Sequence, residues 1–356
     1  MQLHPWLNDP RAVLISHVQP TEPVQWNDFR SAAWRILDAM QVKLDGEKVV
    51  IKPNGTVAER FADPDTGITT HPRFVQGMIE YLHTHGATRR RVFILEDPRN
   101  SDDNEPRHWR GTGFPEVAAQ TGAQLRCPTT YTCVRKTVPH PHAHATLNVS
   151  RLAVVPDTVL INVPKLKTHN LGITTLCLKN LMGTVSVFER HFCAQAWREI
   201  PDEVRSESRP GEIALTRAVH EQWQEGLARR LADLAQIVQP QINVIEGVVG
   251  RDGTGFQNGK NYALGLAIAG INMVAVDSVA SYLMGYDPQS LIYLKIATEA
   301  GPGINDIHML SIYVVQENGS LAPCTDVDAL RAQPPLHVIN KVVDGQEKSM
   351  FADFIK

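Results

Sequence analysis

The most constraining feature of this sequence is the alternation of short apolar runs with a stretch of helical character. Residues 48–54, Lys-Val-Val-Ile-Lys-Pro-Asn, predict a buried strand that ends at a proline, and residues 91–96, Arg-Val-Phe-Ile-Leu-Glu, predict another. Between them, residues 72–85 predict a helix, because Pro72 suits a first helical turn and Gly86 suits the position after the last. This strand–helix–strand order is typical of a parallel crossover unit. It predicts an α/β fold with a mostly parallel or mixed sheet and helices on both faces.

Similar segments follow along the rest of the chain. Apolar runs predict further strands near residues 12–15, 159–163, 243–247, 264–269 and 308–315. Segments of helical character predict helices near residues 26–41, 115–120, 215–238 and 274–284. Residues 124–150 are irregular or hairpin-like, and the polar residues 186–226 predict a lid-like insertion. Because no linker, repeat or low-complexity tract interrupts the pattern, we expect a single α/β domain over residues 1–356, with its core at about 46–315.

Composition excludes several classes of protein. A net charge of −3 argues against broad binding to nucleic acid or to a membrane surface, which needs a basic excess. No apolar run reaches the length of about 18 residues that a membrane span requires. The start of the chain, MQLHPWLNDPR, lacks the pattern of a signal peptide, so a cytoplasmic location is expected. None of the five cysteines lies in a C-x-x-C pair, so free thiols are expected and neither a zinc ribbon nor a cysteine-ligated iron–sulfur run is present.

Lys165, Lys167 and His169 alternate directly after one of the apolar runs. In an extended backbone, side chains two residues apart share a face, so these three are predicted to point the same way. Open α/β sheets place ligands outside the carboxyl ends of their strands. The lysines could therefore hold a carboxylate or a phosphate, and His169 could transfer a proton near neutral pH. The alternative is a solvated strand end, where lysine is common.

A second group follows the neighbouring predicted strands. Lys52 and Asn54 end one strand, and Glu96 ends the next. His71 precedes a helix, whose N-terminal N–H groups favour anions. His71 could also be a simple cap or a core histidine, and Glu96 could be a base, a metal ligand or a counter-ion of the lysines. Their shared edge of the sheet predicts that Lys52, Asn54 and His71 belong to the same site.

Two further segments supply candidate substrate-binding groups. Lys179 and Asn180 could orient a substrate, or they could end an exposed helix with Gly183 as its C-cap. Arg190 and His191 lie in the lid-like insertion, which is expected to close over the site and exclude water.

A glycine-rich loop runs from Gly250 to Lys260. Its spacing matches neither a P-loop nor a dinucleotide-binding fingerprint. Gly253 and Gly255 are expected to let the backbone approach a ligand closely, although a flexible turn is the alternative. Asp277, at or near the start of a later helix, is either an N-cap or a site residue.

His140, His142 and His144 alternate in the run PHPHAH. Alternating histidines can bind a transition metal. The flanking prolines, and the lack of an acidic residue nearby in sequence, favour an exposed loop. No G-x-S-x-G elbow, H-E-x-x-H motif or kinase motif is present.

Several of these motifs together resemble the domain of unknown function 362 family. Besides the strand ending at Glu96, they are VVIKPN at 49–54, TTHP at 69–72, NVPKLKTH at 162–169, LKNLMG at 178–183 and AVDSVASYLMG at 275–285. The resemblance spans about residues 49–306. It implies a shared site at Lys52, His71, Lys165, Lys167, His169, Lys179 and Asn180, without implying a reaction. Many members carry a ferredoxin-like segment with iron–sulfur clusters. This chain lacks that cysteine run, so an iron–sulfur cluster is not expected.

These patterns lead to one functional hypothesis and two alternatives. The chain is predicted to be an enzyme acting on a small anionic metabolite, with His169, His71 and Lys167 as candidate catalytic residues and the other groups as substrate ligands. One alternative is a non-catalytic binding or accessory protein of a redox or biosynthetic complex. The other is a metal-dependent, racemase-like or lyase-like enzyme that uses the histidine run, or His71 and His169 with Glu96. The expected partner is a small anion rather than nucleic acid or membrane, and the chain could form a homo-oligomer.

Overall fold

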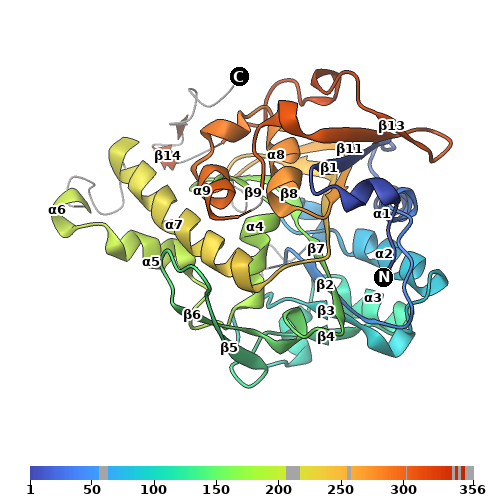
Figure 1. Cartoon of the computed structure of the whole chain (residues 1–356), viewed down its shortest axis with the longest axis horizontal. Coiled ribbons are helices and arrows are strands. Elements are labelled where there is room, and N and C mark those ends of the chain that lie inside the picture. The colour runs from blue at the N-terminus through green and yellow to red at the C-terminus, as the bar shows by residue number, and fades with distance from the viewer. Residues whose placement is uncertain are drawn as a thin grey trace.

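The computed structural model describes residues 1–55, 63–205, 217–254, 258–301, 303–338, 341–343 and 346–348. An eleven-stranded mixed sheet is its main element, with most of its strands in the order β13-β12-β1-β11-β10-β7-β2-β3-β4 (Figure 1). The bounds of these strands are β1 Ala12–His17, β2 Lys48–Pro53, β3 Val92–Leu95, β4 Gln124–Arg126, β7 Thr158–Val163, β10 Ile242–Arg251, β11 Asn261–Gly270, β12 Ser311–Val315 and β13 Leu321–Pro323. The predicted α/β class with a mixed sheet is confirmed.

The predicted crossover unit is present. Strand β2 leads through α2 (Pro72–Thr84) to β3, and β3 pairs with β2 in parallel register, with Val49 opposite Val92. His71 accepts the N–H of Arg73 as the N-cap of α2, and Pro72 follows at the first position of the helix. The sequence pattern therefore predicted both the parallel pairing and the start of the helix.

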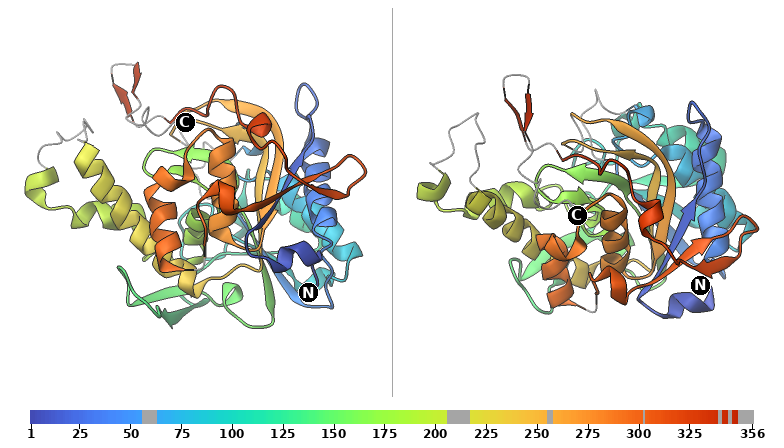
Figure 2. Two further views of the ribbon diagram at one scale, coloured as in Figure 1. Left: turned by 45° about the horizontal axis from the view of Figure 1, so that its top comes forward. Right: turned by 90° about the horizontal axis from the view of Figure 1, so that it is seen from above.

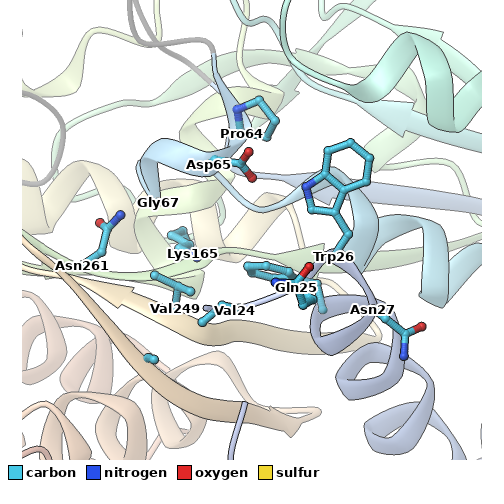
Figure 3. A pocket seen from close by; sticks show the side chains of 12 residues that line it. Val24, Gln25, Trp26, Asn27, Pro64, Asp65, Gly67, Lys165, Val249 and Asn261 are labelled. Carbon is cyan, nitrogen blue, oxygen red and sulfur yellow. The ribbon is translucent and has the colours of Figure 1, made fainter. Parts of the chain in front are cut away.

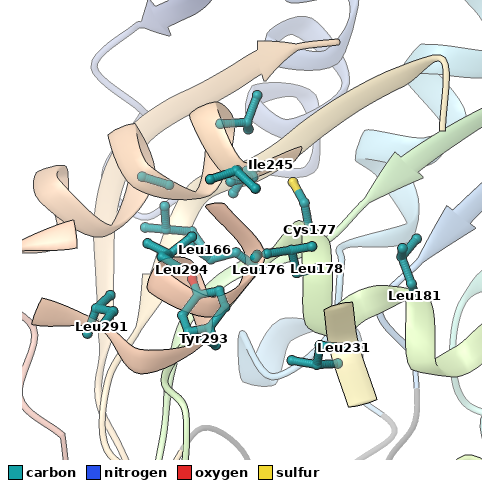
Figure 4. Packing of buried hydrophobic residues seen from close by; sticks show 14 of the residues in the cluster. Leu166, Leu176, Cys177, Leu178, Leu181, Leu231, Ile245, Leu291, Tyr293 and Leu294 are labelled. Carbon is teal, nitrogen blue, oxygen red and sulfur yellow. The ribbon is translucent and has the colours of Figure 1, made fainter. Parts of the chain in front are cut away.

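Helices cover both faces of the sheet (Figures 1 and 2). On one face lie α1 (Trp26–Ala39), α2 and α3 (Phe114–Thr121), and on the other lie α4 (Cys177–Asn180), α7 (Arg217–Ile237), α8 (Met273–Leu283) and α9 (Ile292–Ala300). Alternation along β2 shows how the strands serve both layers. Val49 and Ile51 belong to the core on the α1 and α2 side, whereas Val50 belongs to the opposite core. That opposite core includes Leu166, Ile245 and Leu294 (Figure 4).

The strand that carries the candidate lysines continues from β7 after a single break. Pro164 separates β7 from β8 (Lys165–His169), and β8 pairs with β10 in parallel and with the short β9 (Ile173–Thr175) in antiparallel register. The backbone N–H of Glu246 donates to the carbonyl oxygen of Pro164, so the ladder beside β10 bridges the break. The segment of lysines is thus an extended strand, as predicted, and it prolongs the sheet at its carboxyl end.

The segment 186–226, predicted as a lid-like insertion, packs in part against the core. It contains α5 (Phe192–Glu199), α6 (Asp202–Arg205) and the start of α7, while residues 206–216 lie outside the described part. Phe192 and Ala196 are buried in the core, and α5 packs against α7. Part of the predicted insertion is therefore fixed to the core through α5. Its apolar residues Phe192 and Ala196 are four apart and so share one face of that helix.

Residues 124–150 include a hairpin, as one of the two interpretations predicted. Strand β5 (Cys133–Thr137) pairs with β6 (Thr146–Ser150) in antiparallel register. Across the described residues, none of the helices has the length and apolar character that a membrane span needs.

Candidate functional site

Lys52 and Glu96 form a buried ion pair between two strand ends. The Nζ atom of Lys52 lies 2.7 Å from Oε2 of Glu96, and the two side chains are 0% and 1% exposed. The N–H groups of Gly55 and Asp97 also donate to this carboxylate, at 3.0 and 2.8 Å. Of the three roles open to Glu96, the structure supports that of counter-ion. The charge of Lys52 is balanced by Glu96 inside the protein, and its side chain does not reach the solvent.

The motif LKNLMG packs against this ion pair. A Cβ atom on Gly183 would lie 2.6 Å from Cε and Nζ of Lys52 and 2.7 Å from Oε1 of Glu96, closer than side chains approach. The side-chain amide of Asn180 donates to the carbonyl oxygen of Lys52 at 2.9 Å and to Oδ1 of Asn162 at 2.8 Å. The interpretation of Gly183 as the cap of an exposed helix end is wrong, because Gly183 and Asn180 are both buried.

Gly183→Ala is accordingly expected to destabilise the protein by about 1–3 kcal/mol, because the added methyl group overpacks a buried ion pair. Thermal unfolding would show this as a lower Tm. Gly301→Ala is the matched control, since a Cβ there meets only the carbonyl oxygen of Ala297, at 3.8 Å. Equal Tm values for both variants would contradict the tight packing at Gly183.

Lys165 also forms a buried ion pair, with Glu246. Its Nζ atom lies 2.6 Å from Oε2 of Glu246, and the two side chains are 1% and 0% exposed. Glu246 further accepts the N–H groups of His71 and Val248. Sequence reasoning did not select Glu246, although its position near the end of the strand predicted at residues 243–247 was a usable signal.

His71 has a structural role at the start of α2. Its Nδ1 atom accepts the N–H of Arg73 at 3.2 Å, and its ring stacks on Phe29 with 3.8 Å between centroids. Burial lowers the pKa of His71 to about 4, so the ring is neutral at physiological pH. With Nδ1 as the acceptor, the proton lies on Nε2, which is 3.3 Å from Oδ1 of Asp65.

Lys167 differs from the other two strand-end lysines. Its side chain is 6% exposed, and its Nζ atom donates to the carbonyl oxygen of Ile68 at 2.7 Å. Among the residues that the structure describes, no carboxylate lies within ion-pair distance of this nitrogen. Burial is the largest cause that lowers the pKa of Lys167, to about 7, and the charges of Lys179, Lys165 and Arg251 lower it further. Glu96 opposes this shift only from a distance.

Lys179 and Arg251 complete a group of cations around Lys167. Lys179 lies on α4, is half-buried and forms no ion pair within the described ranges. Arg251, at the end of β10, donates from Nη1 to the carbonyl oxygen of Thr66 at 3.0 Å and to Oδ1 of Asn261 at 2.8 Å. Its Nε atom is buried, with no hydrogen-bond partner among the described residues. Sequence reasoning missed Arg251, although it lies in the glycine-rich loop that was singled out.

The hydrogen bonds of His169 fix the position of its proton. The N–H groups of Leu171 and Gly172 both donate to Nδ1, at 3.0 and 3.2 Å. Burial, followed by the charges of Lys179 and Lys167, lowers the pKa of His169 well below its usual value. The ring is therefore neutral with its proton on Nε2. In this arrangement His169 can donate a hydrogen bond from Nε2 but has no free basic nitrogen.

Asn54 and Gly253 have structural contacts of their own. The backbone N–H of Asn54 donates to Oγ1 of Thr70, and its own Oδ1 is buried without a partner in the described part of the chain. Gly253 has a φ of +82°, and a Cβ there would lie 2.0 Å from the carbonyl oxygen of Asn258. The glycine is thus required by a close approach of backbone to backbone. Gly255 lies outside the described residues.

Arg190 is buried near the Lys52 pair, whereas His191 is exposed. Nη2 of Arg190 donates to Oδ2 of Asp97 at 2.6 Å and to Oδ1 of Asn100 at 2.9 Å. Its Nε and Nη1 atoms are buried and have no partner within the residues described. His191 precedes α5 at the surface. Arg190 therefore belongs to the buried polar contacts near Lys52 and Glu96, whereas His191 lies at the surface.

Asp277 and the histidine run stabilise helices and loops. Asp277 lies inside α8, which Asn272 caps, and its carboxylate accepts the N–H groups of Cys177 and Leu178 at the start of α4. The N–H groups of residues 142–144 donate to the carboxylate of Asp233 on α7. No group of three or more histidine, cysteine or acidic side chains with metal-site geometry occurs in the described ranges.

A cavity of about 640 Å³ lies between Lys165 and the start of α1 (Figure 3). Trp26, Phe29, Asp65 and Asn261 are among its lining residues. Asp65 is 63% exposed, and the charge of Lys165 is cancelled by Glu246. The described lining thus offers an anion no unpaired cation, and this cavity suits an anion less well than the surroundings of Lys167.

The chain belongs to the family named Domain of unknown function (DUF362), whose sequence model matches residues 49–282. This range contains all the strand-end lysines and Lys179. A thylakoid-associated protein of Synechocystis sp. (strain ATCC 27184 / PCC 6803 / Kazusa) is 26% identical over 145 residues. That alignment covers 41% of this chain and 38% of the Synechocystis protein, so this similarity spans less than half of either.

Proposed function

We propose that this protein is an enzyme that binds a small carboxylate- or phosphate-bearing metabolite at Lys167, Lys179 and Arg251. The observation that carries the proposal is the contrast among the buried lysines. Lys52 and Lys165 each have a carboxylate within 2.7 Å, whereas the hydrogen-bond partner of Lys167 in the described part of the chain is a carbonyl oxygen. A buried charge without a counter-ion is costly, and a bound anion would supply the missing partner.

The surrounding groups favour the same kind of ligand. Lys179 and Arg251 add positive charge, and His169 adds a neutral donor, its Nε2–H. Lys52, Lys165 and His71 keep the strand ends in place through their own partners and do not touch the ligand in this proposal. Cationic and neutral side-chain donors, with little competing negative charge, suit carboxylate or phosphate oxygens.

Catalysis rather than simple binding is favoured by the pKa of Lys167. A group with a pKa of about 7 can hold or release a proton at neutral pH, which a general acid or base must do. An accessory protein would need only the charge. We also propose a cytoplasmic location and no nucleic-acid partner, and the net charge of −3 supports the second of these.

Sulfate binding, measured by calorimetry at about pH 6, tests the anion site, because sulfate resembles phosphate and keeps its charge near neutral pH. Lys167→Met and Lys179→Met are each expected to weaken binding about tenfold or more, since a hydrogen bond to a charged group contributes about 1.5–3 kcal/mol. Lys136→Met is the matched control, because Lys136 is exposed on β5. Unchanged sulfate affinity in both site variants would overturn the proposal.

A further inference from the structure

We propose that Lys167 is a nucleophile that forms a Schiff base with an anionic carbonyl substrate, most simply a 2-oxo acid. This inference rests on the proposed function, because it uses the same cations to hold the carboxylate. It goes further by naming the substrate class and the reacting atom. The observation behind it is the different hydrogen-bond partners of Lys52, Lys165 and Lys167.

The partner of the side-chain amine distinguishes Lys167 from Lys52 and Lys165. Lys52 and Lys165 lie 2.7 and 2.6 Å from carboxylate oxygens. Burial lowers the pKa of both lysines, and these carboxylates oppose that shift by favouring the ammonium form. The partner of Lys167 is the carbonyl oxygen of Ile68. A neutral amine satisfies that contact equally well, since it donates one N–H and keeps its lone pair. Lys167 is thus the lysine of the three that can lose its proton without losing an ion pair.

The charges around Lys167 also favour its neutral form. Lys179 from α4, Lys165 from β8 and Arg251 from β10 all disfavour its ammonium form, and burial does so most strongly. Glu96 is the acidic group that opposes them. With a pKa of about 7, roughly half of Lys167 is the neutral amine at neutral pH. Burial beside another cation is a known way to activate a lysine toward carbonyl compounds.

The reaction is formation of an imine. With the carboxylate beside Lys179 and Arg251, the lone pair of Nζ attacks the carbonyl carbon, so a C–N bond forms as the C=O π bond breaks. The resulting carbinolamine takes up a proton on its oxygen, loses one from nitrogen and expels water to give the imine. Amine and ketone thus yield imine and one water, with no oxidant or reductant. The Nε2–H of His169, two residues along β8, can donate a hydrogen bond to the departing oxygen.

Access is consistent with this role. Of the three strand-end lysines, Lys167 is the most exposed, at 6%, against 0% for Lys52 and 1% for Lys165. Its cationic neighbour Lys179 is half-buried and so reaches the surface. A small 2-oxo acid approaching along Lys179 would meet its carboxylate partner first and the amine next.

The test is reductive trapping on the full chain. The protein is incubated with pyruvate at about pH 7 and reduced with sodium borohydride, and the modified lysine is located by peptide mass spectrometry. The adduct is expected on Lys167, with Lys52 and Lys165 unmodified and exposed Lys136 at background. The yield should rise as pH increases through about 7, whereas an ordinary lysine titrates near 10.4. Lys167→Met should lose the adduct, and Lys179→Met should reduce it about tenfold.

Competition separates this proposal from the anion site itself. Sulfate should suppress the adduct, and acetone, which lacks a carboxylate, should give much less of it. If sulfate binds through Lys167 but pyruvate leaves no adduct there, the Schiff-base proposal is wrong and the anion site stands. If neither sulfate binding nor an adduct depends on Lys167, both proposals fail. An adduct that forms equally with acetone and resists sulfate would overturn the assignment to 2-oxo acids.

Discussion

Lys165→Met is expected to destabilise the protein by about 3–5 kcal/mol, whereas Lys167→Met, two residues along the same strand, is expected to be neutral or stabilising. The first change leaves Glu246 as a buried carboxylate without its ion-pair partner, 2.6 Å from where the ammonium was. The second removes a buried cation that has no counter-ion among the described residues and is opposed by three cationic neighbours. The same substitution at two positions of one strand is thus expected to have very different effects on stability.

Thermal unfolding at about pH 7 measures this contrast, with exposed Lys136→Met as the control. The double variant Lys165→Met with Glu246→Gln should recover much of the loss, because no unpaired charge then remains.

The pH dependence of stability has a definite sign for Lys167. Its folded pKa of about 7 lies below the ordinary value, so between about pH 7 and 10.4 the unfolded chain binds more protons and wild-type stability rises with pH. The advantage of Lys167→Met should therefore shrink over that range. A wild-type Tm for Lys165→Met would contradict the buried pair.

The fold was largely predictable from local patterns, since the strands and helices depend on them. The run at residues 48–54 has apolar side chains for both faces of a sheet, and Pro72 and Gly86 mark the limits of a helix, so β2, α2 and their parallel crossover followed from the sequence. The helix α9 (Ile292–Ala300) was not predicted. Gly301 and Pro302 follow it in the sequence as a usable stop signal, but its N-cap, Leu291, is not a residue type that marks the start of a helix.

The roles within the site were much less predictable, because they depend on partners distant in sequence. Lys52 and Glu96 are 44 residues apart, and Lys165 and Glu246 are 81 apart. Alternation shows that Lys165 and Lys167 share a face, yet it cannot show that one of them meets a carboxylate and the other a carbonyl oxygen. Asp277 illustrates the same limit. It was interpreted as either the N-cap of its own helix or a site residue, and it instead accepts N–H groups at the start of α4, 100 residues earlier.

Sulfate affinity should fall as pH rises above about 7, approaching tenfold per pH unit, because only the protonated form of Lys167 offers the anion a positive charge. The other groups that face Lys167 are Lys179 on α4, Lys165 on β8, Arg251 on β10 and Glu96 after β3. Lys165 and Glu96 belong to buried ion pairs, and Arg251 keeps its charge at these pH values. The neighbouring His169 is already neutral near pH 7, so its titration does not contribute.

Calorimetric titrations with sulfate from about pH 6 to pH 9 would measure this dependence, over which wild-type affinity should fall roughly a hundredfold. Lys167→Arg is the decisive variant, because a guanidinium keeps its charge throughout. It should bind sulfate with little change across the same range. The same fall in both proteins would assign the titration to another group. A flat wild-type profile would mean that the anion does not contact Lys167.

The trapping yield with pyruvate should change in the opposite direction, since imine formation needs the neutral amine and sulfate binding needs the ammonium ion. Opposite pH dependences that share a midpoint near 7, and are both lost on replacing Lys167, would trace binding and chemistry to this one nitrogen.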